Sequence, residues 1–324
     1  MRNFKIAQPK SLDQATSLLA KKKENVFLLA GGTDLISEIK EEVLEPEILV
    51  DLKAIENLSY IEKGEDGIRI GALTAIAELA ENPIIKQEYP GLNEAAQSIS
   101  SPQLRNMGTV GGNLCQRPRC WYYRDGQVKC RKKGGNRCFA LRGRNKYHGI
   151  LGGGLCYIVH PSDLAPMLMA LDAEISIHSE KGTQSIPLSN FFVLPQTNVR
   201  RENILNSGEI ITEIKIPTSK SGDKSTYLKL KERGTWDFAL VSAAVKGSPN
   251  GQVFRDIRIV LGGVAPIPWR AQPAENMIKG KKATEELIRQ AAKEALKEAK
   301  PLEENEYKKE LVETVLARAV LSLV

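Results

Sequence analysis

The first part of the chain alternates helical and extended patterns of apolar residues, which predicts a small α/β unit. Apolar side chains recur at helical spacing before a short apolar run that is typical of a buried strand. Gly31 and Gly32 end that strand, and Thr33 or Asp34 can begin the helix that follows. The expected helix, strand, helix and strand span residues 11–24, 26–30, 33–40 and 48–52. This order favours a parallel sheet.

Beyond residue 57 the pattern becomes that of a mixed or antiparallel sheet with several helices. Residues 68–70 alternate as in a strand, and residues 174–178 and 184–186 flank a Glu-Lys-Gly turn that is typical of a hairpin. A longer strand is expected over residues 206–217. Helices are expected over residues 74–81, 92–99 and 162–169. Residues 58–217 are therefore expected to form a second α+β unit.

A polar stretch of low complexity over residues 218–224 marks a domain boundary. Three strand patterns and two long amphipathic helix patterns follow it. The strands are expected over residues 227–231, 240–246 and 257–261, and the helices over residues 284–300 and 305–321. We therefore expect an α+β domain over residues 225–324, with a three-stranded antiparallel sheet. It follows the first two units, which are expected over residues 1–57 and 58–217.

Composition and charge place few limits on function. The chain has 324 residues and 42% of them are hydrophobic, which is enough for more than one core. The formal net charge of +7 is a mild excess that fits an acidic partner but does not by itself indicate nucleic-acid binding. The first residues do not resemble a secretory signal, and no apolar run approaches the ~18 residues that span a bilayer. We expect a cytoplasmic protein without a membrane span.

Two glycine-rich segments have the composition of loops that bind a phosphate. Residues 28–35 leave a predicted strand, turn at two glycines and enter a helix, and residues 107–113 contain three further glycines. Glycine allows backbone N–H groups to approach an anion closely, and a helix N-terminus carries about half a positive charge. Neither segment matches the Rossmann fingerprint or the P-loop. One such loop is weak evidence, whereas two suggest a ligand with two phosphates that is held from both sides.

All five cysteines lie between Cys115 and Cys156, in a segment without regular periodicity. Only Cys115 and Cys120 have the close spacing that zinc ribbons use, but four thiolates from a long loop can also hold an iron–sulfur cluster. The segment is strongly basic, because residues 117–146 contain a single acid, Asp125. These bases can belong to a solvated loop, to a nucleic-acid surface with neighbouring aromatic residues, or to a charge environment that offsets a cluster.

The glycine-rich segments also carry a more specific pattern. Residues 30–35 are Ala-Gly-Gly-Thr-Asp-Leu, and residues 105–113 are Arg-Asn-Met-Gly-Thr-Val-Gly-Gly-Asn. They resemble the two pyrophosphate loops of the FAD-binding medium subunits in the xanthine dehydrogenase and carbon monoxide dehydrogenase family of molybdenum hydroxylases. Further segments that are similar to this family follow in order at residues 71–74, 161–166, 209–217, 227–229, 237–239 and 262–266. The resemblance covers nearly the whole chain and implies that the first two units form a two-part FAD-binding domain.

The resemblance implies a role for each matching residue. The two loops would hold the FAD diphosphate, and an isoleucine of residues 210–211 would pack on the ring. Asp163 would bind the ribityl or isoalloxazine end, and Lys229 would lie near the polar edge of the flavin and favour an anionic reduced form. Without the resemblance, Asp163 would be interpreted as a helix N-cap and Lys229 as a solvated lysine. The implied FAD-binding residues are Leu28, Leu29, Ala30, Gly31, Gly32, Thr33, Asp34, Leu35, Thr74, Gly108, Thr109, Gly111, Gly112, Asn113, Asp163, Ile210, Ile211 and Lys229.

Residues 115–156 resemble the cluster-bearing insertion of a subset of these flavoprotein subunits, those of 4-hydroxybenzoyl-CoA reductases and of some bacterial aldehyde oxidoreductases. Cys115 directly follows the second FAD loop and is expected to pack as a small apolar residue. The implied cofactors are therefore FAD and one [4Fe–4S] cluster. By this resemblance the cluster ligands would be Cys120, Cys130, Cys138 and Cys156.

As a whole, the resemblance implies an oxidoreductase subunit that relays electrons. It would work beside a large subunit that binds molybdopterin and a small subunit with [2Fe–2S] clusters, and a ferredoxin or NAD would be the external carrier. The three histidines are not paired with a nucleophile, so no catalytic residue is expected in this chain. Two other functions stay open: a stand-alone FAD oxidase, and a basic zinc-dependent nucleic-acid-binding protein. The substrate stays open because its contacts would lie on another chain.

Overall fold

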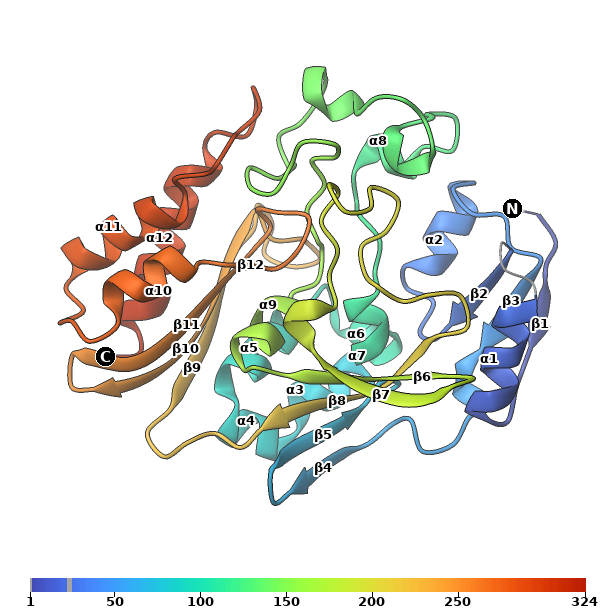
Figure 1. Ribbon diagram of the computed structural model, residues 1–324, viewed down its shortest axis with the longest axis horizontal. Helices are drawn as coiled ribbons and strands as arrows, with labels where there is room; N and C mark the ends of the chain where they lie inside the picture. Colours follow the sequence, from blue (N-terminus) through green and yellow to red (C-terminus); the bar gives the residue numbers. More distant parts are fainter. Residues whose placement is uncertain (1, 22–24) are drawn as a thin grey trace.

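Three β-sheets follow one another along the chain, and helices pack between and around them (Figure 1). The structure, a computed structural model, describes residues 2–21 and 25–324. In Figure 1 the N-terminal unit lies on the right, the middle unit below, the C-terminal domain on the left and the cysteine-containing segment at the top. Within the described ranges, no helix is both long enough and apolar enough to cross a membrane.

The N-terminal unit is a parallel sheet with two helices, as the apolar pattern predicts, but it has a third strand, β1, that was not expected. Its strands lie in the order β1-β3-β2, and its last strand runs into a 3₁₀ turn at Leu52–Ala54. The expected extension of the first helix over residues 22–24 lies outside the described residues. The carboxyl end of β2, where the first glycine-rich loop begins, lies beside that of β3. The elements are β1 (Lys5–Ala7), α1 (Leu12–Lys21), β2 (Val26–Leu29), α2 (Leu35–Lys40) and β3 (Ile48–Asp51).

The middle unit is an antiparallel five-stranded sheet, in the order β4-β5-β8-β6-β7, with short helices. Its strands are β4 (Ile61–Gly64), β5 (Gly67–Gly71), β6 (Glu174–Ser179), β7 (Gly182–Pro187) and β8 (Ile210–Pro217). Its helices are α3 (Ile76–Glu81), α4 (Pro83–Glu88), α5 (Pro90–Ser98), α6 (Pro102–Met107), α7 (Val110–Leu114) and α9 (Leu164–Ala170), with a 3₁₀ turn at Leu188–Asn190. The apolar period did not predict α4, α6 or α7. These helices are short, α4 and α6 begin at a proline, and α7 contains two adjacent glycines.

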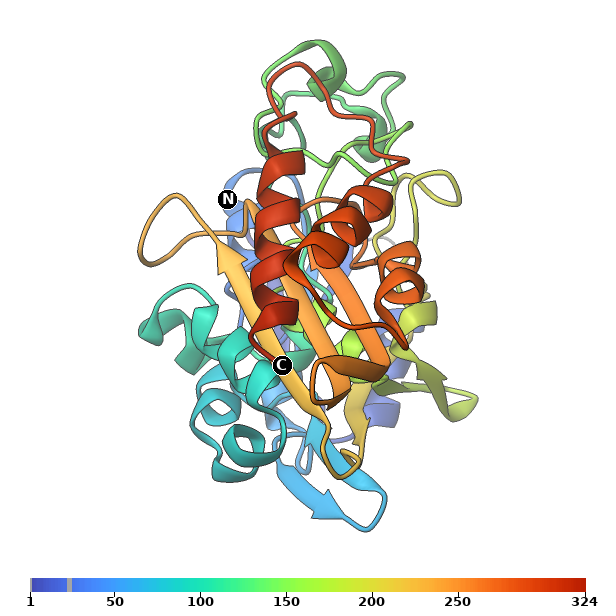
Figure 2. The same ribbon diagram turned by 90° about the vertical axis from the view of Figure 1, so that its left-hand side faces the viewer.

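The C-terminal domain has a four-stranded antiparallel sheet, in the order β12-β11-β10-β9, rather than the expected three strands. The additional strand, β12 (Trp269–Arg270), has two residues and therefore shows no alternation. The α+β class is confirmed. Figure 2 shows the last three helices covering one face of this sheet. The other elements are β9 (Lys224–Leu230), β10 (Val241–Asn250), β11 (Val253–Gly262), α10 (Gln272–Ile278), α11 (Glu285–Ala295) and α12 (Lys308–Leu321).

The middle unit and the C-terminal domain share a hydrophobic core. Side chains alternate between the two faces of a strand, and both faces of β10 are buried. Val241, Ala243 and Val245 pack toward α10, α11 and α12, whereas Ala244 joins the core of the middle unit. Helices α5 and α9 fill the space between the two sheets. This packing fixes the position of β9 relative to α9, which matters for the site.

Residues 115–156, here called the cysteine segment, are mostly irregular and are held against the C-terminal domain. The segment contains α8 (Trp121–Arg124) and 3₁₀ turns at Arg131–Lys133 and Phe139–Arg142. The carboxylate of Glu304 accepts from the backbone N–H of Asn145 at 2.6 Å, and the Asn305 amide donates to the carbonyl of His148 at 3.1 Å. The ammonium of Lys308 donates to the carbonyls of Tyr147, at 3.1 Å, and Gly263, at 2.7 Å.

The buried Lys308 makes stability depend on pH in a specific window. Burial lowers its pKa to about 7, whereas an unfolded lysine titrates near 10.4. The unfolded chain therefore holds this proton more tightly between these values, and the free energy of unfolding rises with pH there. In urea denaturation from about pH 7.5 to 9.5, wild type should gain up to about 1.4 kcal/mol per pH unit relative to Lys308→Met. The neighbouring half-exposed Lys309, changed to Met, should leave the wild-type slope unaltered, and parallel slopes for Lys308→Met would contradict the prediction.

Candidate cofactor site

The two glycine-rich loops meet backbone to backbone. The first loop joins β2 to α2, and the second joins α6 to α7. A Cβ atom at Gly31 would lie 1.8 Å from the carbonyl oxygen of Met107 and 3.0 Å from the Cα of Gly108, so only glycine fits there. Both loops line one cavity of about 230 Å³. The predicted residues in its lining are Leu28, Ala30, Gly31, Gly32, Thr33, Asp34, Leu35, Gly108, Thr109, Gly112 and Asn113.

Hydrogen bonds fix the second loop in this position. Thr109 precedes α7, and its hydroxyl accepts from the backbone N–H of Gly112 at 3.2 Å, as an N-cap does. The N–H of Gly111 donates to the carbonyl of Ala72 at 2.8 Å, and the carbonyl of Thr74 accepts from the loop at 3.0 Å. Thr74 and Gly111 therefore anchor the loop from behind the cavity wall.

Asp163 receives two side-chain donors from β9. Its carboxylate accepts from the Tyr227 hydroxyl at 2.6 Å and from the Lys229 ammonium at 2.7 Å. These two residues reach the same acid because alternate residues of a strand share one face. The side chains of Asp163 and Lys229 are only 7% and 3% exposed, so Lys229 is not a solvated strand lysine. Burial, with the neighbouring Asp163, raises the pKa of Tyr227 well above its usual value.

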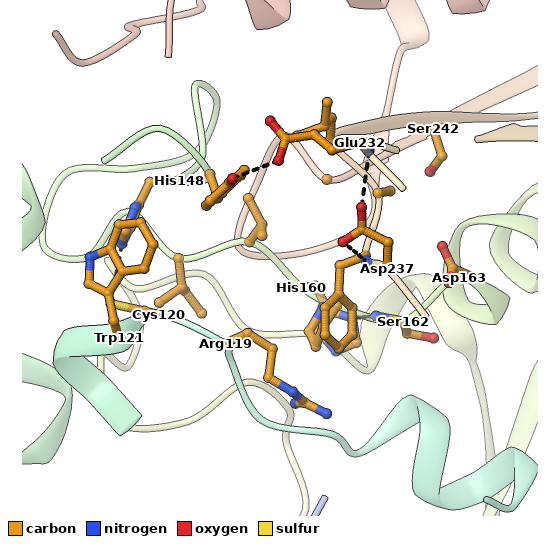
Figure 3. Close-up of a pocket in the computed structure, with 18 of the residues that line it drawn as sticks. Arg119, Cys120, Trp121, His148, His160, Ser162, Asp163, Glu232, Asp237 and Ser242 are labelled. Atoms are coloured by element: carbon orange, nitrogen blue, oxygen red, sulfur yellow. Dashed lines mark hydrogen bonds between the residues drawn. The ribbon is translucent and has the colours of Figure 1, made fainter. Parts of the chain in front are cut away.

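Two further cavities extend from the loops toward the cysteine segment. One, of about 390 Å³, shares Gly108 and Asn113 with the loop cavity and reaches Asp163. The other, of about 340 Å³, also contains Asp163 and Arg119 in its wall and reaches Cys120. Figure 3 shows Cys120 on one side of this third cavity, Asp163 on the other and Arg119 between them. The cavities therefore form a series from the glycine-rich loops to the cysteines.

Some predicted residues lie behind the cavity walls. The Thr74 side chain is fully buried, and its hydroxyl donates to the carbonyl of Tyr60 at 2.9 Å and accepts from its N–H at 3.1 Å. Ile210 packs in the core of the N-terminal unit, and Ile211 packs in that of the middle unit. Direct contact of these residues with FAD stays a prediction. The predicted residues outside the three linings are Leu29, Thr74, Gly111, Ile210, Ile211 and Lys229.

Sequence reasoning missed several residues that line the cavities, most notably arginines of the cysteine segment. A basic segment is most simply interpreted as a solvated loop, yet Arg119 and Arg124 turn inward. They lie 2.9 Å and 2.6 Å from the carboxylate of Asp34, which stands at the start of α2 but caps no backbone N–H. Burial lowers the pKa of Arg119. Arg119 lines two of the cavities, whereas Arg124 lies outside all three linings. The other missed lining residues include Ile99, Gln116, Arg117, Trp236, Asp237 and Phe238.

Four of the five cysteines line one small cavity inside the cysteine segment, and its walls are largely aromatic and aliphatic. They come from separate turns of the segment and are the four that the sequence singled out: Cys120, Cys130, Cys138 and Cys156. All five cysteines lie in the described part of the chain, and all are free thiols. Cys115 lies instead in the loop cavity, where burial raises its pKa to about 12.

The four thiols influence one another without forming a site for a single metal ion. A hydrogen bond between Cys138 and Cys156 lowers the pKa of Cys138 to about 6 and raises that of Cys156. Burial raises the pKa of Cys120 to about 11. The Nε2 atom of His148 lies 3.2 Å from the Cys120 sulfur. Across residues 2–21 and 25–324, no three His, Cys, Asp or Glu side chains are arranged to hold a metal ion. Tetrahedral zinc would need sulfurs about 3.8 Å apart.

Two family models together match nearly the whole chain. The FAD binding domain in molybdopterin dehydrogenase matches residues 2–219, and the CO dehydrogenase flavoprotein C-terminal domain matches residues 225–323. The chain is an FAD-binding medium subunit of the molybdenum hydroxylase family. This medium subunit is thus part of an oxidoreductase.

Individual relatives from the same family match this chain over almost their full length. The medium subunit is 34% identical over 306 residues to the aldehyde oxidoreductase FAD-binding subunit PaoB of Escherichia coli, which covers 93% of this chain and 92% of that one. It is 30% identical over 302 residues to the carbon monoxide dehydrogenase medium chain of Hydrogenophaga pseudoflava, which covers 93% and 88%. A solved structure of carbon monoxide dehydrogenase from Hydrogenophaga pseudoflava matches with a TM-score of 0.78 at 28% identity, over 99% of this chain and 97% of that one.

The geometry of the loop cavity fits the diphosphate of FAD. The close contact at Gly31 leaves backbone, rather than side chains, facing a ligand between the loops. Arg117 lines the same cavity and supplies positive charge. Burial opposes that charge, but Glu202 together with Tyr123, Glu38 and Asp34 outweighs burial and raises the pKa of Arg117. Phosphates are commonly bound by such combinations of backbone N–H groups and arginine.

Changing Gly31 to Ala should remove FAD from the medium subunit. The added methyl group would occupy the space of the Met107 carbonyl and push the two loops apart. Overpacking of this kind costs on the order of 1–3 kcal/mol, which corresponds to tenfold or more in affinity. FAD content after purification and flavin titration would measure the loss. Gly64→Ala is the control, because its Cβ would have its nearest neighbour at 3.6 Å. Equal FAD content in both variants would contradict this account of the loops.

Proposed function

We propose that this medium subunit relays electrons between redox centres of partner subunits and an external carrier, through FAD and one [4Fe–4S] cluster that it binds itself. The observation that supports this most is the third cavity, because Asp163 and Cys120 line it together. FAD supplies the exchange between two-electron and one-electron transfer. The role of the polypeptide is to hold FAD and the cluster close together and to fix the charges around them.

At the flavin end, Asp163 lies in the cavity wall and Lys229 is paired with it from behind, so the two form a fixed dipole. Tyr227 and the carbonyl of Ser98 also bind this pair, the latter at 3.2 Å from the Lys229 ammonium. A cation that is held in advance favours negative charge nearby without further reorganisation. We assign to Lys229 the role of favouring the reduced, anionic ring, and to Asp163 that of holding Lys229 in place.

The four thiols lie around one cavity, which supports a cluster with four cysteine ligands. Each thiolate of a [4Fe–4S] cluster binds a different iron, so its four sulfurs stand farther apart than those around one zinc. Cys120, Cys130, Cys138 and Cys156 line one shared cavity, as the four ligands of a single cluster would. Lys132 lines the cavity and is paired with Glu202 at 2.5 Å. Its charge would offset part of the negative charge of the cluster.

Two observations favour the electron relay over the alternative functions. A zinc-dependent nucleic-acid-binding protein would leave the two glycine-rich loops and the cavity between them without a role. A stand-alone oxidase does not agree with the names of the relatives, which are called FAD-binding subunit and medium chain. This chain covers 88% to 97% of those relatives and of the solved structure.

We propose that the partners are a large subunit that binds molybdopterin and a small subunit with [2Fe–2S] clusters. The similar chains are named as a subunit of an aldehyde oxidoreductase and as the medium chain of a carbon monoxide dehydrogenase, and these names support such a complex. A cytoplasmic location is consistent with five cysteines that all remain free thiols.

The surface of the cysteine segment supports an acidic ferredoxin as the external carrier, in preference to NAD. Lys129 and Arg137 are exposed, and each directly precedes one of the cavity cysteines, Cys130 and Cys138. Arg142 is also exposed, a few residues further on. A positive surface over a redox centre attracts an acidic protein and orients it for transfer.

Replacing a proposed cluster ligand should remove iron, whereas replacing Cys115 should not. Wild-type protein that is purified without oxygen should contain about four irons per chain and a broad absorbance near 400 nm. Cys138→Ser should lose both, because a serine hydroxyl is a poor substitute for a thiolate. Cys115→Ser is the matched control and should keep the iron, because Cys115 lies in the loop cavity. Stoichiometric zinc in wild type, or iron loss in the control, would reject the assignment.

Reversing charge on the basic surface should slow transfer to an acidic ferredoxin. In the native complex, the double variant Arg137→Glu with Arg142→Glu should lower the second-order rate by about tenfold at low salt, because electrostatic steering is lost. The difference should shrink as salt screens the charges. Arg255→Glu, an exposed arginine on β11, is the control. The same loss in this control, or a wild-type rate that does not respond to salt, would count against the docking surface.

A further inference from the structure

We infer that the carboxylate of Asp34 is a positioning group that makes FAD affinity depend on whether the cysteine segment holds its cluster. This inference rests on the proposed function, because it needs the cluster. It adds a thermodynamic link between two sites that were predicted separately from two different motifs. The link follows from contacts between the first glycine-rich loop and the cysteine segment.

Three donors of the cysteine segment converge on Asp34. One oxygen, Oδ2, accepts from the backbone N–H of Arg117 at 2.7 Å. The other, Oδ1, accepts from the Arg124 guanidinium at 2.6 Å and lies 2.9 Å from that of Arg119. The side chains of Asp34 and Arg124 are 16% and 9% exposed, so water screens these charges little. Asp34 belongs to the wall of the loop cavity, so its position affects the shape of the FAD site.

The same donors stand on both sides of a proposed cluster ligand. Arg119 directly precedes Cys120, and Arg124 ends α8, the helical turn that begins directly after it. Arg124 also donates to the carbonyl of Pro118 at 2.7 Å, which closes this stretch into one compact turn. A metal bond to Cys120 would hold the turn in place. Its loss would free the turn and, with it, the donors to Asp34.

Further contacts join the same turn to α2. The Tyr123 hydroxyl donates to the buried carboxylate of Glu38 at 2.6 Å. A Cβ atom at Gly126 would lie 2.9 Å from the carbonyl of Glu41, so the segment also packs against the end of α2. In Figure 1, α8 lies next to α2, above the N-terminal sheet. The helix is thus held along its length by the segment that carries the thiols.

The coupling should be reciprocal, because FAD and the cluster would stabilise the same arrangement of Asp34 and its donors. A ligand that binds one arrangement better shifts the population toward it, and each ligand then strengthens the other by the same factor. Coupling between two sites commonly amounts to 5–150-fold in affinity, so we expect a factor of about ten here.

The test compares FAD affinity in iron-loaded and iron-free full-length protein. FAD is titrated into flavin-depleted samples and its fluorescence quenching is followed. Wild type should bind FAD about tenfold more weakly without iron, and reloading iron and sulfide should restore the affinity. In Asp34→Asn, which keeps the size but loses the charge, the two forms should differ by less than about twofold. A merely structural loss would weaken both forms and leave their ratio unchanged.

Glu41→Gln is the matched control. Glu41 lies 3.6 Å from Arg124 and is 43% exposed, so this variant removes a neighbouring carboxylate and leaves Asp34 intact. It should retain the tenfold ratio. An equal affinity in the two wild-type forms overturns the coupling, and a ratio that persists in Asp34→Asn overturns the role of Asp34.

A second measurement does not need a folded iron-free protein. Saturating FAD should slow the loss of iron to a chelator by about tenfold in wild type but not in Asp34→Asn. The same iron-loss rate with and without FAD in wild type would reject the inference. The failure of this inference can be distinguished from that of the proposed function. If wild-type protein contains no iron, the proposed cluster is rejected before any FAD is titrated. If it contains iron but iron and FAD do not affect each other, only this inference is rejected.

Discussion

The contact between Gly31 and the Met107 carbonyl is the constraint on which the cofactor site depends. The first loop comes from the carboxyl end of a parallel sheet, and the second comes from a helical connection in an antiparallel unit. The two units fold around different cores, so neither one forms the cavity by itself. The proposed FAD site therefore lies at the junction of the two units, and any change that alters their relative position also alters the cavity between the loops.

Two aspartates show how this protein uses acidic residues at the start of helices. Asp34 and Asp163 precede α2 and α9, yet neither side chain caps its helix. A cap contributes about 1 kcal/mol, whereas leaving a buried charge without its partner costs about 3–5 kcal/mol. The ion pairs therefore decide where these side chains point. Asp163 joins α9 to β9, and Asp34 joins α2 to the cysteine segment, so each acid connects two parts of the site.

The sequence predicted the long elements with a clear period, such as α12, and it missed several of the short ones. Strand β12 has two residues, so the C-terminal sheet was expected with one strand too few. The four cavity cysteines could be selected through the family resemblance. The inward-facing arginines could not be predicted, because the sequence does not distinguish an arginine that pairs with an acid from one that faces water. The pairing of Asp34 with Arg117 joins positions 83 residues apart, and no local pattern reveals it.

The cysteine segment contacts two other parts of the chain. It is bound to the start of α2 through Asp34 and to α12 through Lys308. If evolution deleted this segment from a related chain, it would leave an acid near the diphosphate cradle without its arginines. It would also leave a buried ammonium with only one of its two carbonyl acceptors. Gain or loss of the segment thus requires compensating substitutions in both flanking domains. Positions 34 and 308 should accordingly covary with the presence of the cysteines across the family.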